Sequence, residues 1–263
     1  MRRRSRSQLG STPVSAFDVN KMTPLGEAAP RPARAQSTCQ ACTVRHLTVC
    51  APLDDQEVQE VAAISQTLEM APGDPLFDEG ECADQVYNVT AGTMKIYKLL
   101  PDGRRQVTGF LFPGDFLGLA NNDTYAYSAE AVTHATLCRF PRTKLDKLLE
   151  RHPKMEKRLL SIASHELAVA QEQMLLLGRK TAKEKIASFL LNLSERAESR
   201  GQTGNPVSVP MSRTDIGDFL GLTTETVSRT FTNLRTSGAI ALRNGGKVEI
   251  QDRDSLSAIA QGD

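Results

Sequence analysis

The spacing of apolar residues changes near Pro153, and this change limits the folds available to the chain. Between residues 72 and 140, short apolar or alternating stretches are separated by turn signals such as Pro113-Gly114-Asp115. Many short strands at this spacing are typical of an antiparallel sandwich or barrel. Beyond Pro153 the apolar residues recur three and four positions apart, which predicts helices. We therefore expect an α+β chain whose strands precede its main helices.

The length and charge of the chain exclude several protein classes. With 263 residues, the chain is long enough for two domains. Its 32 basic residues balance 31 acidic ones, which excludes a uniformly basic coat for nucleic acid. No apolar run is long enough for a membrane helix, and no apolar h-region follows the N-terminal arginines. We expect a soluble cytoplasmic protein that has no secretory signal and does not bind a membrane.

A long helix predicted over residues 154–180 carries an uninterrupted apolar seam. Its members recur at intervals of 3, 4, 3, 4 and 3 residues, and none of them is charged. They are Leu160, Ala163, Leu167, Ala170, Met174 and Leu177. An amphipathic helix packed on its own domain would also show such a face, but almost three heptads without a charge favour a partner helix. The seam therefore predicts a homodimer joined through this helix.

Residues 212–237 carry the signature of two short helices joined by a tight turn. Ser212 begins a capping-box-like pattern, Gly221 supplies the turn, and Thr223 can cap the second helix. Such a pair is a helix-turn-helix, whose second helix enters the major groove of DNA. Residues 240–250 follow with a hairpin pattern that turns at an Asn-Gly-Gly sequence. Together these features predict a winged helix.

The exposed side of the second helix carries groups that can read base edges. Arg229 can pair bidentately with guanine, Glu225 can accept from the cytosine amino group, and Ser228 can contact a base or a phosphate. Any solvated helix face can carry Glu and Arg, but recognition helices meet the bases within these first two turns. Thr224 and Arg213 complete the predicted contacts. Paired recognition helices would bind a palindromic site in double-stranded DNA.

Three of the five cysteines form the pattern C-x2-C-x7-C. The odd number of cysteines and the missing signal peptide argue against a disulfide framework. Thiolates bind both zinc and iron–sulfur iron, and either site needs a fourth ligand besides Cys39, Cys42 and Cys50. The spacing leaves three candidates open. These are Cys82, Cys138 and His46.

From the residues alone, an iron–sulfur cluster and a zinc site explain the cysteines about equally well. A redox or hydrolytic enzyme is a further possibility. However, no Glu or His stands at hydrolase spacing near the cysteines, and an enzyme leaves the helix-turn-helix without a role. We therefore expect a DNA-binding protein that is not an enzyme, and whose cysteines either sense a signal or act as a zinc staple.

The chain divides into four predicted segments. Residues 1–36 are rich in Arg, Ser, Pro, Ala and Gln without an apolar period, which is typical of a disordered basic tail. Residues 37–153 hold the cysteines and the strands, with an amphipathic helix expected over residues 52–70. Residues 154–180 form the dimerisation helix. Residues 181–263 form the DNA-binding winged helix-turn-helix.

Together these features resemble the CRP/FNR family of bacterial transcription regulators, most closely its FNR branch and the FnrN/FixK-like proteins of alphaproteobacteria. The resemblance covers residues 37–255. It implies an N-terminal antiparallel β-roll, which is the jelly roll of cyclic-nucleotide-binding domains, then a long dimerisation helix and a C-terminal winged helix-turn-helix. The most specific motifs are the cysteine pattern, Thr108-Gly109-Phe110, Gly114-Asp115, the segment 137–141 and the segment 215–229.

The resemblance also implies a cofactor and a mechanism. The cofactor is an oxygen-labile [4Fe–4S] cluster whose fourth ligand is Cys138, which leaves Cys82 as the extra thiol. An intact cluster would favour dimerisation, so that Glu225, Ser228 and Arg229 read TTGAT half-sites. The dimer would then activate transcription through contact with RNA polymerase when oxygen is scarce. A zinc-stapled or clusterless CRP-like regulator that responds to another effector is the alternative.

Cyclic nucleotides are not expected as ligands of this chain. Nucleotide-binding relatives place an arginine before Ser-Ala to hold the cyclic phosphate, whereas Tyr127 precedes Ser128-Ala129 here. The acidic residue after Gly114 is Asp115 in place of the usual Glu. Without a cation, the phosphate would lose its main charge-assisted contact.

Overall fold

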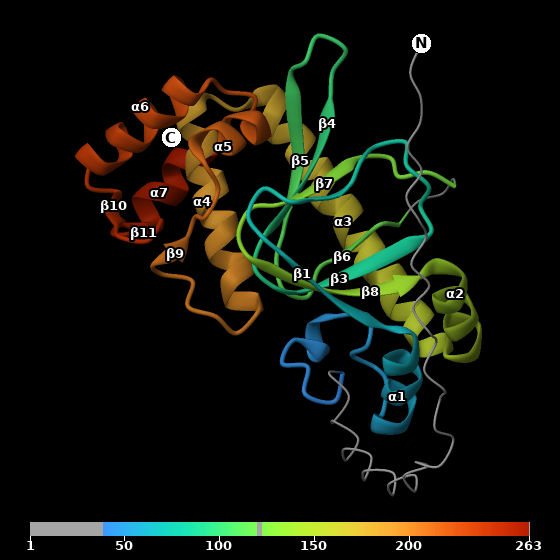
Figure 1. The fold of residues 1–263 in the computed structure, drawn as a ribbon. Helices are drawn as coiled ribbons and strands as arrows, with labels where there is room; N and C mark the ends of the chain where they lie inside the picture. Colours follow the sequence, from blue (N-terminus) through green and yellow to red (C-terminus); the bar gives the residue numbers. More distant parts are fainter. Residues whose placement is uncertain (1–38, 120–122, 263) are drawn as a thin grey trace, which may run out of the picture. The chain divides into compact units, whose positions relative to one another are not determined.

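The computed structural model describes residues 39–119 and 123–262, whose fold is shown in Figure 1. The basic tail predicted over residues 1–36 lies outside the described residues. In the described part, strands with two flanking helices come first, followed by a long helix and a winged helix. The α+β class expected from the change in apolar spacing is therefore confirmed.

Two antiparallel sheets form the β-roll. In the described residues, one sheet has the strand order β1-β8-β3-β6 and the other the order β2-β7-β4-β5. Val89 and Leu137 of the first sheet are fully buried in one core with Met94 and Ala129 of the second. The predicted antiparallel sandwich is thus confirmed. The strands are β1 (Gln66–Met70), β2 (Pro75–Phe77), β3 (Gln85–Ala91), β4 (Met94–Leu99), β5 (Arg105–Leu111), β6 (Phe116–Leu117), β7 (Ser128–Ala131) and β8 (Ala135–Pro141).

A close approach between two turns of the β-roll requires glycine at Gly92. This residue follows β3 and has a φ of +80°. A Cβ atom there would lie 2.1 Å from the carbonyl oxygen of His134 in the turn before β8. Because glycine alone adopts this conformation freely and leaves this space, β8 can pack tightly beside β3.

Helix α1 (Asp55–Ile64) is shorter than the helix predicted over residues 52–70. Asp54 caps its start by accepting two backbone N–H bonds, each 2.9 Å long. Beyond Ile64 the chain forms β1 instead and pairs with β8. The C-terminal third of that prediction was therefore wrong, because sheet pairing overrides the helical spacing of the apolar residues.

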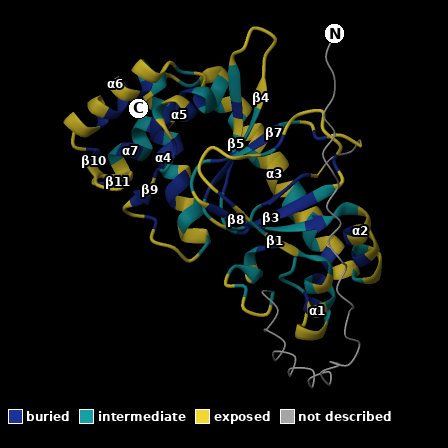
Figure 2. Ribbon diagram, in the orientation of Figure 1, coloured by how far each residue is buried: buried dark blue, intermediate teal, exposed yellow. Residues whose placement is uncertain are grey.

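Helix α2 (Arg142–Arg151) leads into the long helix α3 (Pro153–Arg179). Pro153 suits the first turn of α3, where its missing N–H group would have no helical partner. The bounds of α3 lie within one residue of the predicted long helix. Met155 is the one residue of α3 that is buried in this structure, and Figure 2 shows the rest in the intermediate and exposed colours.

The C-terminal part of the chain is a winged helix whose core includes the fully buried side chains of Ile186, Leu190 and Ile216 and is shared with Val107 and Phe110 of β5. The predicted hairpin forms and adds β9 at its edge, giving the order β10-β11-β9. None of the helices in residues 39–119 and 123–262 is long and apolar enough to cross a bilayer. The elements are α4 (Ala182–Ser199), β9 (Val207–Ser208), α5 (Arg213–Leu220), α6 (Thr224–Thr236), β10 (Ile240–Arg243), β11 (Lys247–Ile250) and α7 (Arg253–Gln261).

Candidate metal centre and nucleic-acid interface

Four of the five cysteines line one small cavity between the β-roll and the segment that precedes α1. Cys39, Cys42 and Cys50 come from that segment, and Cys138 comes from β8. Cys82 lies elsewhere, exposed and opposite Thr124 in an isolated β-bridge. The structure therefore brings Cys138, and not Cys82, to the three cysteines of the C-x2-C-x7-C pattern.

Local backbone bonds shape the cysteine segment. The N–H group of Cys42 donates to the carbonyl oxygen of Cys39 at 3.4 Å, and the N–H group of Cys50 donates to Oγ1 of Thr48 at 3.2 Å. Val49 is fully buried in the core formed by α1, α2 and the start of α3. His46, the third candidate ligand, is exposed and does not line the cavity.

The environment of two of the thiols, Cys50 and Cys138, favours their protonated form. Burial raises the pKa of Cys50 to about 11, which outweighs the hydrogen bond from Thr48. Burial also raises the pKa of Cys138 to about 12, and Cys39, Cys42 and Cys50 add to that increase through their charges. Because metals bind thiolates, loading this site would release protons.

The chemistry of the cavity fits an iron–sulfur cluster, although no three cysteine, histidine or acidic side chains within residues 39–119 and 123–262 lie together as a site for a metal ion. The four thiols surround a cavity with apolar walls that include Val58, Val61 and Phe140. Four cysteines are the usual ligands of a [4Fe–4S] cluster. The cavity also holds a buried polar atom without a partner, Oδ1 of Asn88.

The cysteine segment contacts the long helix directly. The guanidinium group of Arg158, one turn into α3, donates to the carbonyl oxygens of Leu47 at 2.8 Å and Thr48 at 3.4 Å. Leu159 and Ile162 of α3 pack against the same core as Cys50 and Cys138. The conformation of the cysteine segment is therefore coupled to the position of α3.

Most of the predicted seam lies on the surface of α3. Leu160, Leu167 and Met174 are 68%, 61% and 66% exposed, which is unusual for large apolar side chains. Leu177 is half-buried and lies close to Gly221, where a Cβ atom would be 3.7 Å from it. Ala163 is also half-buried, and Ala170 is exposed. The seam thus offers an apolar face to a partner helix. Its last residue, Leu177, lies beside the winged helix.

The predicted helix-turn-helix forms as α5 and α6. Ser212 caps α5 by accepting from the N–H group of Asp215 at 3.0 Å, and Thr223 caps α6. Gly221 ends α5 with a φ of +64°, the left-handed conformation that favours glycine. A Cβ atom on Gly217 would lie 2.6 Å from the carbonyl oxygen of Leu222. The two helices can therefore pack closely only because this position is glycine.

Glu225, Ser228 and Arg229 lie on the exposed side of α6, opposite its buried residues. Arg229 and Glu225 form an ion pair with each other. This pair would have to rearrange before the two side chains could contact DNA. Thr224 is also exposed. Arg213 is half-buried, and its guanidinium carbon lies 3.5 Å from the ring centroid of Phe231. Burial lowers its pKa. Arg213 therefore supports the packing of α6, and its contact with DNA stays a prediction.

Comparison with known proteins agrees with this architecture. The model of the cyclic nucleotide-binding domain matches residues 67–152, and that of the Crp-like helix-turn-helix domain matches residues 184–259. The transcriptional activatory protein AadR of Rhodopseudomonas palustris is 42% identical over 237 residues, which cover 88% of this chain and 99% of AadR. The chain belongs to the CRP/FNR family of transcription regulators.

Other CRP/FNR members show similar agreement. The nitrogen fixation regulation protein FixK of Bradyrhizobium diazoefficiens is 41% identical over 222 residues, covering 84% of this chain and 93% of FixK. The solved structure of FixK2 from Bradyrhizobium japonicum has a TM-score of 0.70 and 35% identity, covering 74% of this chain and 97% of that one. Both relatives are named as regulators and not as enzymes, in agreement with the prediction that the chain is not an enzyme.

The two residues on which the prediction about cyclic nucleotides rests, Tyr127 and Asp115, are bound to other groups of this CRP/FNR regulator. The hydroxyl group of Tyr127, the residue before Ser128-Ala129, accepts from the N–H group of Gly118 at 3.1 Å. Asp115 accepts from Arg196 of α4 at 2.7 Å and from Arg200, the residue that follows α4, at 2.8 Å. Neither residue offers a cation to a phosphate.

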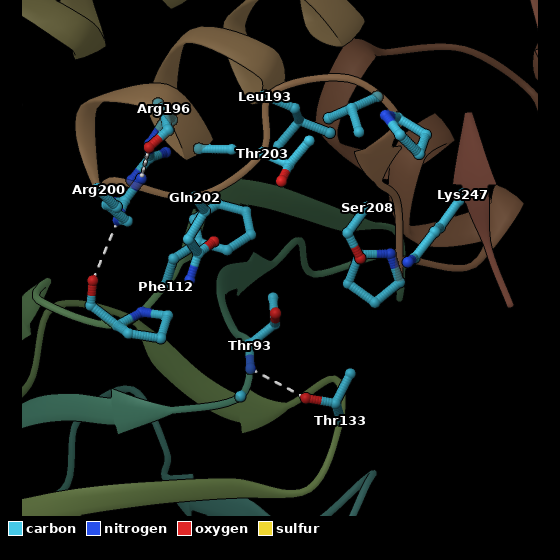
Figure 3. Close-up of a pocket in the computed structure, with 16 residues that line it drawn as sticks. Thr93, Phe112, Thr133, Leu193, Arg196, Arg200, Gln202, Thr203, Ser208 and Lys247 are labelled. Atoms are coloured by element: carbon cyan, nitrogen blue, oxygen red, sulfur yellow. Dashed lines mark hydrogen bonds between the residues drawn. The ribbon is translucent and has the colours of Figure 1, made fainter. Parts of the chain in front are cut away.

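A larger cavity of about 410 Å³ lies between the β-roll and the winged helix. Figure 3 shows Thr93, Phe112 and Thr133 of the β-roll around this cavity, together with Arg196 of α4 and Arg200, which follows α4. Both arginines are already bound to Asp115, and both guanidinium groups lie over the ring of Phe112. These residues therefore stabilise the junction between the two parts of the regulator.

Proposed function

We propose that this chain is an oxygen-responsive activator whose four cysteines hold a [4Fe–4S] cluster that controls dimerisation and binding to a palindromic FNR-type site. The observation that carries the proposal is the position of Cys138, which joins Cys39, Cys42 and Cys50 at one cavity. When bound, the cluster supplies an oxygen-labile crosslink between the segment before α1 and strand β8. A DNA-binding regulator of this kind would act in the cytoplasm.

Arg158 connects this crosslink to the dimer interface. When the cysteine segment is ordered on the β-roll, its carbonyl oxygens at Leu47 and Thr48 bind the guanidinium group and orient the first turns of α3. When the segment is released, Arg158 loses both acceptors and the equilibrium shifts away from the position of α3 that pairs. This is a population shift driven by contacts that one state has and the other lacks.

Dimerisation places two recognition helices at the spacing of successive major grooves. The exposed seam residues Leu160, Leu167 and Met174 are the apolar surface that two copies of α3 would bury. Arg229, Glu225 and Ser228 would then read the two half-sites of a palindrome. As an activator, the dimer would recruit RNA polymerase, and its relatives carry activator names.

Anaerobic purification followed by iron, sulfide and zinc analysis tests the cofactor. We expect about four iron and four sulfide per chain, a brown colour that bleaches in air, and operator binding that is lost with it. Cys138→Ala should lose iron and site-specific DNA binding together, whereas the matched control Cys82→Ala should keep both. Zinc in place of iron would support the stapled alternative. Equal anaerobic operator affinity for Cys138→Ala and wild type would contradict the coupling.

A further inference from the structure

Asn88 is a polar residue in the middle of strand β3, where its neighbours are apolar. It is 2% exposed, and Val86 and Val89 beside it are buried at 1% and 0%. Its Oδ1 atom has no hydrogen-bond partner in the described structure. A buried amide oxygen without a partner destabilises a fold, because its hydrogen bond to water is lost and not replaced. A side chain of this kind at this position therefore calls for a ligand.

The Asn88 side chain lines the cysteine cavity. Asn88 and Cys138 are directly opposite each other on β3 and β8. Opposite residues of antiparallel strands point to the same face, with their Cβ atoms about 5 Å apart. The amide is therefore beside the sulfur atom that completes the set of four cysteines.

The other polar side chains around the cavity are already engaged. Thr90 donates to the carbonyl oxygen of Thr136 at 2.9 Å, Thr48 donates to that of Arg45 at 3.0 Å, and Arg45 pairs with Asp55 at 2.9 Å. Among the described residues that line this cavity, Asn88 is thus the uncommitted amide. Rotation about its last side-chain bond lets it present either its oxygen or its N–H donors.

We propose that the Asn88 amide donates an N–H hydrogen bond to the Cys138 thiolate of the loaded site and thereby prolongs the lifetime of the bound cluster. The inference rests on the proposed function. Donors beside metal-bound sulfur stabilise its negative charge and tune the reduction potential and stability of the centre. Asn88 is a positioning residue in this account, since it acts through Cys138 and the metal-bound sulfur.

The variant Asn88→Leu tests this role, because leucine has a similar shape and no hydrogen-bonding group. In the cluster-free protein we expect Asn88→Leu to raise the unfolding temperature, since an unsatisfied amide is removed. In the loaded protein we expect the cluster to be lost in air about tenfold faster than from wild type. A purely structural role would move both measurements in the same direction. Asn88→Thr, which keeps a hydroxyl donor, should give an intermediate lifetime.

Thr90→Val is the matched control, because Thr90 lines the same cavity on the same strand but already has a partner. It should lower the unfolding temperature of the cluster-free protein and leave the cluster lifetime and the Fe–S stretching bands in resonance Raman spectra unchanged. Asn88→Leu should shift those bands. Iron-loaded Asn88→Leu with the wild-type lifetime and bands would overturn the inference while leaving the proposed function intact. Wild-type protein without iron would overturn both.

Discussion

The ammonium group of Lys95 lies 2.9 Å from Oδ1 of Asp215, although 120 residues separate them in the sequence. Lys95 is on β4 of the β-roll, and Asp215 is in the first turn of α5 in the helix-turn-helix. Both are buried, at 5% and 7% exposure. Arg105 of β5 also lies 2.9 Å from Asp215, and Glu130 of β7 lies 2.8 Å from Lys95. A network of ion pairs around the buried Lys95 and Asp215 therefore connects the β-roll, which bears the cysteines, to the helix-turn-helix.

We expect Lys95→Met to lower the free energy of unfolding by about 2 to 3 kcal/mol, because it removes a cation from the buried carboxylate of Asp215 and from the half-buried carboxylate of Glu130. Urea unfolding measures this change. Lys98→Met is the matched control on the same strand, since Lys98 forms an exposed pair with Glu79. That control should change stability by less than about 0.5 kcal/mol. An equal loss of stability in the two variants would show that the buried pair of Lys95 stabilises the fold no more than the exposed pair of Lys98.

The Asp215 carboxylate makes stability depend on pH at the acidic end. Burial alone would raise its pKa, but hydrogen bonds from Ser212 and Lys95 outweigh burial and hold the pKa below its ordinary value of 3.8. A carboxyl group whose pKa is lowered by folding stabilises the folded state at every pH above the pKa that it has in the unfolded chain. This stabilisation is lost as the pH falls through the lower pKa of the folded state. Asp215→Asn should therefore be less stable than wild type at neutral pH, and the difference should shrink below about pH 4.

Urea unfolding of both proteins across that range checks the sign of the effect. A gap between Asp215→Asn and wild type that stays the same from neutral pH to about pH 3 would show that the loss does not come from the charge of Asp215. The substitution isolates the charge, because asparagine keeps a side-chain oxygen that can accept from Ser212 and does not titrate.

Removing the Arg158 contact should separate cofactor binding from DNA binding. We expect anaerobic Arg158→Gln to keep its iron but to bind its operator about tenfold more weakly, since two charge-assisted hydrogen bonds to the cysteine segment are lost. Lys157→Gln, an exposed neighbour on α3, is the control and should match wild type. Unchanged operator affinity of iron-loaded Arg158→Gln would remove Arg158 from the coupling path.

Ala170→Asp tests the seam. Pairing of α3 would place two like charges close together across the dimer axis in a desolvated position, so we expect the anaerobic dimer to dissociate. Sedimentation measures the mass of the particle. Gln171→Asp adds the same charge one position away, off the seam, and should leave the dimer intact. A dimer that survives Ala170→Asp would show that the copies meet elsewhere.

Local sequence patterns predicted the parts of the fold that depend on local interactions. The bounds of α3, the two helices of the helix-turn-helix and the hairpin after them agree with caps, glycines and apolar periods read from the chain. The helix predicted over residues 52–70 failed in its last third, where β1 forms. Pairing with β8, far along the chain, decides that segment, and no local pattern contains this information.

The candidate site shows the same division. Spacing identified Cys39, Cys42 and Cys50 but left the fourth cysteine open, because strand pairing places Cys138 at the cavity. Asn88 gave a signal that was available in advance, a lone amide within the apolar strand sequence Val-Tyr-Asn-Val. Arg158 gave none, since α3 carries many charged residues and only the fold shows which one meets the cysteine segment.

The most direct test of the central claim is the operator affinity of one anaerobic preparation, measured with its iron content before and after air is admitted. The account predicts that affinity and iron fall together, and that both return when the protein is reloaded with iron and sulfide. Protein that loses its iron in air and still binds the operator with undiminished affinity would contradict it.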